Sequence, residues 1–313
     1  MSAHQASYVT LDVFSEQRFR GNPVAIVKIS NDYELSQDQK QRIAREFNFS
    51  ETVFLHAGGE SPRVDIFTPV NEMEFAGHPI IGTGHLLFQE SAANMQASSL
   101  TVVTKAGPVP LTYDRENRLV HATVPQNIHI HEQEATLDQI RAVQPSLNVP
   151  LDPDNVKSTY PVVSMVRGVT YTLVDLTKRH DLFAQVVPGE SPKLDLDEEW
   201  SPSFTGVMYY RLLNVHVERE SGVVVWYLRV RMIAINLEDP ACGSGGCSLS
   251  AYLALSRGQE DRIHRFNIDQ GSEMGRDSRI VVDICLDEGR RRVSEVKLAG
   301  QATVVAEGRI SLD

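Results

Sequence analysis

The chain has 313 residues, of which 42% are hydrophobic and 23% are charged, and its formal net charge is -11. This length predicts about two globular domains. A negatively charged protein repels phosphate, which argues against a nucleic-acid partner and against an anionic membrane. Three cysteines are too few for a disulfide framework and fit a reducing compartment. Because the chain shows neither a secretory signal pattern nor an apolar run of about 20 residues, we expect a cytoplasmic protein with no membrane partner.

The first half of the chain predicts a run of strands that contains two helices. Segment 36–48 is expected to form a helix with Ser36 as its N-cap. Segment 77–90 is expected to form an apolar helix with a glycine-rich beginning. β-branched and aromatic residues predict strands at 8–14, 22–29, 51–57, 63–69 and 100–113.

The second half repeats this plan. Segment 243–256 predicts another glycine-rich helix start, and the acidic, proline-interrupted segment 194–204 predicts a surface loop. The two special helices begin at Gly77 and Gly243, about half the chain apart, which indicates an internal duplication. Strands are expected at 158–168, 171–176, 222–233, 265–271, 278–286 and 294–312.

We therefore predict an α+β fold of two similar β-rich domains, each wrapped around one apolar helix. The expected domains are 1–125 and 126–313, with the final C-terminal strand as a candidate to return to the first. The active site is expected in the cleft between them.

The two helix starts predict anion binding. A helix N-terminus leaves backbone N–H groups unpaired and carries positive partial charge, and glycines let a ligand approach closely. A single cluster of this kind is more often a tight turn, but two at matching places favour a site for an anion, either a carboxylate or a phosphate. We predict Gly77, Gly243, Ser244 and Gly245 as substrate-binding residues.

Titratable groups lie beside both helix starts. His78 follows Gly77, and both Asp239 and Cys242 precede the second start. A thiol at a helix N-terminus is expected to have a lowered pKa and to act as a base or nucleophile, although a free cysteine is more commonly a small buried apolar residue. Glu51 opens an apolar strand, where it is either a solvated edge residue or a buried carboxyl with a function.

Other chemistries fit the sequence less well. The glycines of 77–85 have P-loop spacing but place Thr83 where the lysine belongs. His129 and His131 alternate onto one strand face with no third ligand spaced to join them, so we predict no metal site and no cofactor. A serine hydrolase lacks its GxSxG elbow.

Four stretches in order resemble the PhzF (phenazine biosynthesis-like) family, which has the diaminopimelate-epimerase-like fold. They are DVFSEQRFRGNPVAIV, NFSETVF, DIFTPVNEMEFAGHPIIGTGH and EDPACGSGG, and QGSEMGRDS resembles a later family segment. The resemblance spans nearly the whole chain and implies two similar domains, each a β-barrel-like sheet wrapped around a central helix. It also implies cofactor-independent isomerase chemistry and a homodimer. It implies that Glu51 transfers the proton, and it places His78, Asp239, Ser244, Gly77 and Gly243 in the site.

One departure from the family leaves alternatives open. Phenazine enzymes usually have threonine at the position of Cys242, whereas related epimerases have cysteine there and a second cysteine at the position of Ala76. Our leading hypothesis is an isomerase that uses Glu51 to move a proton between carbons of a small carboxylate-bearing metabolite. The alternatives are a racemase or epimerase using Cys242 with Glu51, and a non-catalytic metabolite-binding protein.

Overall fold

The computed structural model describes residues 4–30, 33–56, 58, 61–90, 96–148, 156–257 and 261–312. The expected strand 51–57 therefore ends with one residue outside the described part. The chain divides into two compact units, which we call the N-unit (1–124 with 299–313) and the C-unit (125–298). Over the described residues, every helix is too short or too polar to span a bilayer.

Over its described residues, the N-unit consists of one sheet and two helices. Its hydrogen-bonded strand order is β20-β1-β2-β3-β4-β6-β7-β8, with β5 added beside β4. The β2–β3 and β4–β6 pairs are parallel, and the others are antiparallel. The elements are β1 Gln5–Val13, β2 Asn22–Ile29, α1 Gln37–Phe47, β3 Glu51–His56, β4 Arg63–Phe67, β5 Glu72–Met73, α2 Gly77–Glu90, β6 Ser99–Thr104, β7 Gly107–Asp114, β8 Leu119–Thr123 and β20 Ala302–Ser311.

The C-unit has the strand order β9-β12-β13-β14-β15-β17-β18, with β16 beside β15. From β12 to β18 the parallel and antiparallel pairs alternate as they do from β1 to β7, so the two sheets share one topology. The main elements are β9 His129–Ile130, β12 Val162–Val166, β13 Val169–Asp175, β14 Phe204–Val217, β15 Val224–Ala234, β16 Leu237–Asp239, α5 Gly243–Arg257, β17 Ile263–Gln270 and β18 Ser278–Leu286. They are followed by β19 Val293–Gly300, whose last two residues belong to the N-unit. The smaller ones are β10 Ala135–Thr136, α3 Leu137–Val143, β11 Thr159–Tyr160 and α4 His180–Gln185.

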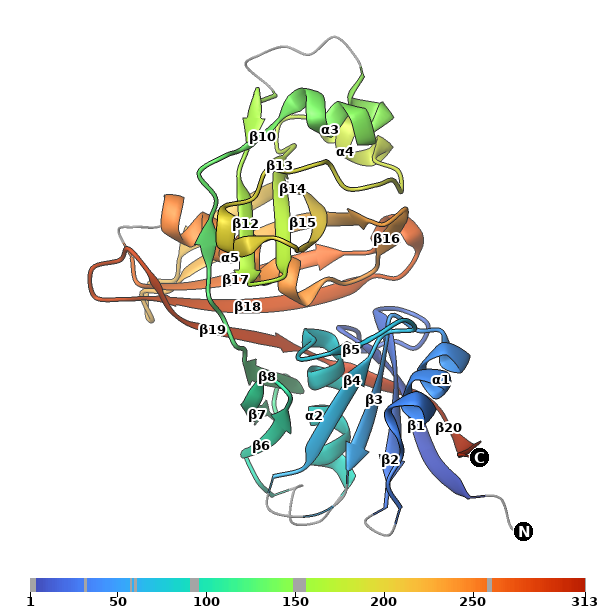
Figure 1. Ribbon diagram of the computed structural model, residues 1–313. Coiled ribbons are helices and arrows are strands. Elements are labelled where there is room, and N and C mark those ends of the chain that lie inside the picture. The colour runs from blue at the N-terminus through green and yellow to red at the C-terminus, as the bar shows by residue number, and fades with distance from the viewer. Residues whose placement is uncertain are drawn as a thin grey trace. The chain divides into compact units, whose positions relative to one another are not determined.

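Each unit buries one apolar helix among its strands (Figure 1). In α2 every residue from His78 to Phe88 is buried, and the helix contacts β1, β2, β3, β8 and β20. In α5 the buried residues extend almost to the C-terminal turn, and the helix contacts β12, β13, β14, β17 and β18. Such a helix is apolar all round because it has no solvent face. The predicted fold class is confirmed, and α2 and α5 begin at the predicted glycines.

Close packing explains the glycines inside α2. A Cβ at Gly84 would lie 2.7 Å from Val120 Cγ1, and one at Gly82 would lie 3.0 Å from methyl groups of Val13 and Val24. These valines are fully buried and have little freedom to move away. We expect Gly84→Ala to lower the free energy of unfolding by about 1–3 kcal/mol through overpacking, despite alanine's better helix propensity. Urea denaturation checks this, with Ser99→Ala as an exposed control, and unchanged stability would contradict it.

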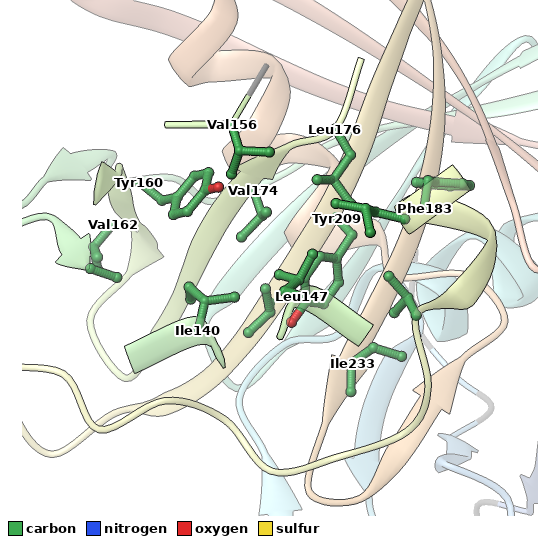
Figure 2. Packing of buried hydrophobic residues seen from close by; sticks show 14 residues of the cluster. Ile140, Leu147, Val156, Tyr160, Val162, Val174, Leu176, Phe183, Tyr209 and Ile233 are labelled. Carbon is green, nitrogen blue, oxygen red and sulfur yellow. The ribbon is translucent and has the colours of Figure 1, made fainter. Parts of the chain in front are cut away.

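The outer layer of the C-unit was not predicted. Helices α3 and α4 pack on β13, β14 and β15 around a buried cluster that includes Ile140, Phe183 and Tyr209 (Figure 2). The longest strand, β14 Phe204–Val217, was also absent from the prediction. In addition, the expected strand 100–113 is a hairpin of β6 and β7 with Lys105 and Ala106 at its turn. Gly107 follows the turn, and its φ of +113° suits glycine.

Candidate active site

Glu51 lies at the first position of β3, directly after α1 and its short exit turn. Asn48 ends α1 with a left-handed φ of 53°, which redirects the chain into the strand. Glu51 pairs in register with Val24 of β2, and its side chain is 17% exposed. The interpretation of Glu51 as a solvated edge residue is therefore wrong. Burial raises the pKa of this carboxyl, and a hydrogen bond from Ser50 opposes the shift.

His78, the second residue of α2, lies beside this carboxyl. The Oε2 atom of Glu51 is 3.5 Å from Nε2 of His78, which is longer than a good hydrogen bond. Oε2 is buried and makes no hydrogen bond to any residue that the structure describes. A buried carboxylate oxygen in this condition is costly unless it takes up a proton or meets a ligand. Glu51 thus has the chemistry of a proton acceptor, with His78 as its polar neighbour.

Cys242 acts as the N-cap of α5. Its carbonyl accepts from Gly246 N at 2.9 Å, and its Sγ accepts from Gly245 N at 3.4 Å. The expected lowering of the Cys242 pKa is wrong: burial raises it to about 12, and the negative charge of Asp239 adds to the effect. Loss of water outweighs the helix dipole and the weak hydrogen bonds that favour the thiolate.

Asp239 and Gln270 hold the turn that leads into α5. Asp239 Oδ1 accepts from Ala241 N at 2.9 Å, which closes an Asx-type turn. The buried Gln270 bridges the turn, because its Nε2 donates to Asp239 O at 2.7 Å and its Oε1 accepts from Cys242 N at 3.2 Å. The backbone of the helix start is therefore fixed by side chains from β16 and β17.

Tyr171 of β13 fixes the side chain of Ser244. Its hydroxyl lies 2.7 Å from Ser244 Oγ and 3.3 Å from Cys242 Sγ. Burial raises the pKa of Tyr171 well above its usual value, so the phenol stays neutral and available as a hydrogen-bond donor. Gly245 meets a packing requirement as well, since a Cβ there would lie 2.5 Å from Met208 Sδ.

The structure thus groups the predicted residues within each unit. In the N-unit it brings Glu51 to His78, next to Gly77, and in the C-unit it brings Asp239 and Cys242 to the start of α5, where Gly243, Ser244 and Gly245 lie. Sequence reasoning missed Tyr171 and Gln270. Gln270 is the first residue of the QGSEMGRDS stretch, which resembles a family segment, so the sequence contained a signal that could have identified it. No sequence motif marked Tyr171.

The raised pKa predicts a poorly reactive Cys242. At pH 8 a thiol with a pKa of about 12 is ionised roughly a thousandfold less than an ordinary cysteine. We expect iodoacetamide to label the half-buried Cys285 first and Cys242 far more slowly, as followed by peptide mass spectrometry. Rapid labelling of Cys242 at pH 7, together with loss of activity, would contradict this and would favour thiol-based epimerisation.

The chain is similar to known proteins over nearly its whole length. The model of the family described as phenazine biosynthesis-like protein matches residues 11–308. A trans-2,3-dihydro-3-hydroxyanthranilate isomerase from Pseudomonas aeruginosa is 30% identical over 310 residues, which cover 97% of this chain and 99% of that protein.

Solved structures share the fold. A PhzF-family protein from Bacillus anthracis superimposes with a TM-score of 0.73 at 20% identity, covering 98% of this chain and 99% of that one. A hydroxyproline epimerase from Agrobacterium vitis superimposes with a TM-score of 0.57 at 16% identity, covering 99% and 93%. The chain therefore belongs to the phenazine biosynthesis-like (PhzF) family of isomerases.

Proposed function

We propose that this isomerase moves a proton between two carbons of a small carboxylate-bearing metabolite, with Glu51 as the acid and base and without a cofactor. The observation that carries the proposal is the buried Glu51 carboxyl, whose pKa is raised and whose Oε2 atom lies 3.5 Å from His78. A carboxyl with a raised pKa is a better general base near neutral pH than an ordinary glutamate.

The reaction is balanced without an oxidant or reductant. The C–H bond breaks, its proton passes to the Glu51 carboxylate, and the electron pair spreads into the adjacent unsaturated or carboxyl group. The same proton then forms a bond to a second carbon, which restores the carboxylate for the next turnover. His78 lies close enough to orient the carboxyl and the substrate.

Binding of the substrate anion is assigned to the helix starts. The amides near Gly77 and Gly243 and the hydroxyl of Ser244 suit a carboxylate. Tyr171 supports this by holding the Ser244 hydroxyl, and Gln270 by holding the turn before it. That both helix starts and Asp239 act on a single substrate stays a prediction, as do the homodimer and the cytoplasmic location.

The surroundings of Cys242 argue against the epimerase alternative. Its thiol is buried, is held as an N-cap and has a pKa of about 12, so it is a poor base. The position of the second cysteine in epimerases is Ala76 here. The non-catalytic alternative does not account for a carboxyl buried at a cost beside His78.

Substrate trials in D₂O test the proposal. The panel begins with trans-2,3-dihydro-3-hydroxyanthranilate, the substrate in the name of the Pseudomonas aeruginosa relative, and continues with amino and hydroxy acids. We expect proton NMR to show one member converted to an isomer with the hydrogen at a different carbon. Inversion with exchange of the α-hydrogen would instead indicate an epimerase. Tight carboxylate binding without turnover or exchange across the panel would contradict catalysis.

A further inference from the structure

A cluster of metal-ligating side chains lies in the C-unit, apart from the residues assigned to catalysis. The expectation that no third ligand joins His129 and His131 is wrong, because Asp197 from the segment before Trp200 reaches them. One nitrogen or oxygen from each of these three residues lies within 4.8 Å of the others. Asp197 Oδ2 is 2.5 Å from His129 Nε2 and 3.6 Å from His131 Nδ1.

The three ligand atoms need small side-chain rotations to share one ion, because their present separations run from 2.5 Å to at most 4.8 Å. Three ligand atoms that each lie about 2.1 Å from one tetrahedral ion are roughly 3.4 Å apart. The side chains of His129 and Asp197 are about 30% exposed, so they have room for the small rotations that a common ion requires. The same exposure gives an ion and its remaining water ligands access from solvent.

The surroundings of His131 resemble those of a metal-binding histidine. Its side chain is fully buried, and its Nε2 lies 2.9 Å from Ser164 Oγ, which in turn contacts Thr170 Oγ1 at 2.7 Å. When this nitrogen donates its proton to Ser164, the lone pair is left on Nδ1, which faces Asp197. Fixing the tautomer through the second ring nitrogen is the usual support for a histidine ligand.

Charge also favours a cation. Asp197 belongs to the acidic segment LDLDEEW, in which four carboxyl groups lie within five residues.

We propose that His129, His131 and Asp197 form a binding site for a divalent transition metal of the zinc, cobalt or nickel type. Two imidazoles and one carboxylate suit these ions, whereas magnesium and calcium prefer all-oxygen sites. The ion replaces the hydrogen bonds that now link these residues, in which Asp197 N donates to His131 Nδ1 and the His129 ring contacts the Asp197 carboxylate. Its effect is to anchor the acidic segment to β9, and it takes no part in the proposed proton transfer.

Trp200 provides a direct signal for binding. Its ring stacks on His129 with centroids 4.5 Å apart and an interplanar angle of 6°. We expect added Co²⁺ or Ni²⁺ to quench Trp200 fluorescence with a stoichiometry of one ion per chain and a dissociation constant in the micromolar range or below. Zn²⁺ should compete, Mg²⁺ should not, and calorimetry with Zn²⁺ should give the same stoichiometry.

Variants distinguish this site from incidental binding. His129→Gln and Asp197→Asn alter half-exposed groups, and each is expected to weaken binding at least 100-fold, while His216→Gln, an exposed histidine elsewhere in the C-unit, should leave it unchanged. Trp200→Phe should abolish the quenching by Co²⁺ or Ni²⁺, whereas calorimetry should still detect binding of the ion. If the wild type binds no ion at 100 µM, or if His129→Gln binds as well as the wild type, the cluster is only a hydrogen-bonded clamp and the proposal is wrong.

Discussion

Replacing Glu51 with glutamine is expected to reduce turnover by roughly 100- to 10,000-fold, the usual contribution of a general acid–base group. Glutamine keeps the shape of the side chain but cannot accept the proton. Substrate binding should persist, because the proposed anion-binding groups are unchanged. Steady-state kinetics with the substrate identified from the panel, together with calorimetric binding, measures both effects. Turnover within a few-fold of the wild type would remove Glu51 from the mechanism.

Although Glu51→Gln is expected to lose activity, it is not expected to lose stability above the ordinary glutamate pKa. Because burial raises the pKa of Glu51 in the folded protein, the folded state binds this proton more tightly than the unfolded chain does. The wild type therefore loses stability as the pH rises from the ordinary glutamate range through the raised pKa, and glutamine does not. We expect Glu51→Gln to be at least as stable as the wild type at pH 8. Glu46→Gln, on the exposed face of α1, is the matched charge control.

The second large effect is expected at the ion pair of Arg231 and Glu238. Both side chains are less than 10% exposed, and two bonds of 2.8 and 2.6 Å join the guanidinium to the carboxylate. Arg231 also donates to the carbonyl of Phe183 at 3.2 Å. Removing one partner of such a pair leaves the other charge buried, so Arg231→Met is expected to cost about 3–5 kcal/mol. The pair also fixes β16, whose last residue is Asp239.

Trp fluorescence during urea unfolding measures this effect. Both tryptophans, Trp200 and Trp226, lie in the C-unit, so the signal reports on the unit that carries the ion pair. The double variant Arg231→Met/Glu238→Leu removes both charges and should recover most of the lost stability. A loss below 1 kcal/mol for Arg231→Met alone would show that the carboxylate of Glu238 finds water or another partner.

Much of the fold was predictable because its main signals are local. The glycine-rich starts of α2 and α5, the Ser36 cap of α1 and the β-branched strands each appear within a few consecutive residues. Helix α3 carried such a signal too, since Thr136 and Gln139 form a capping box that sequence reasoning overlooked. The strand β14 was harder to predict because its last five residues are exposed and lack the pattern of a half-buried strand.

The parts of the site that escaped prediction depend on long-range contacts. Tyr171 and Cys242 are 71 residues apart, and His129 and Asp197 are 68 residues apart, so only the folded sheet brings each pair together. The pKa of Cys242 was predicted in the wrong direction for a related reason. The helix N-terminus is visible in the sequence, but the burial that outweighs it is a property of the packed unit.

An NMR titration of Glu51 measures the property on which the proposed proton transfer depends. The protein can be labelled with ¹³C at the glutamate carboxyl groups, and the Glu51 resonance assigned from its absence in Glu51→Gln. We expect this carboxyl to titrate clearly above the ordinary glutamate value of 4.5, because burial disfavours its charged form. A Glu51 carboxyl that titrates at or below 4.5 would be a solvated or permanently ionised group, and it would rule out the proposed role of Glu51 as the acid and base.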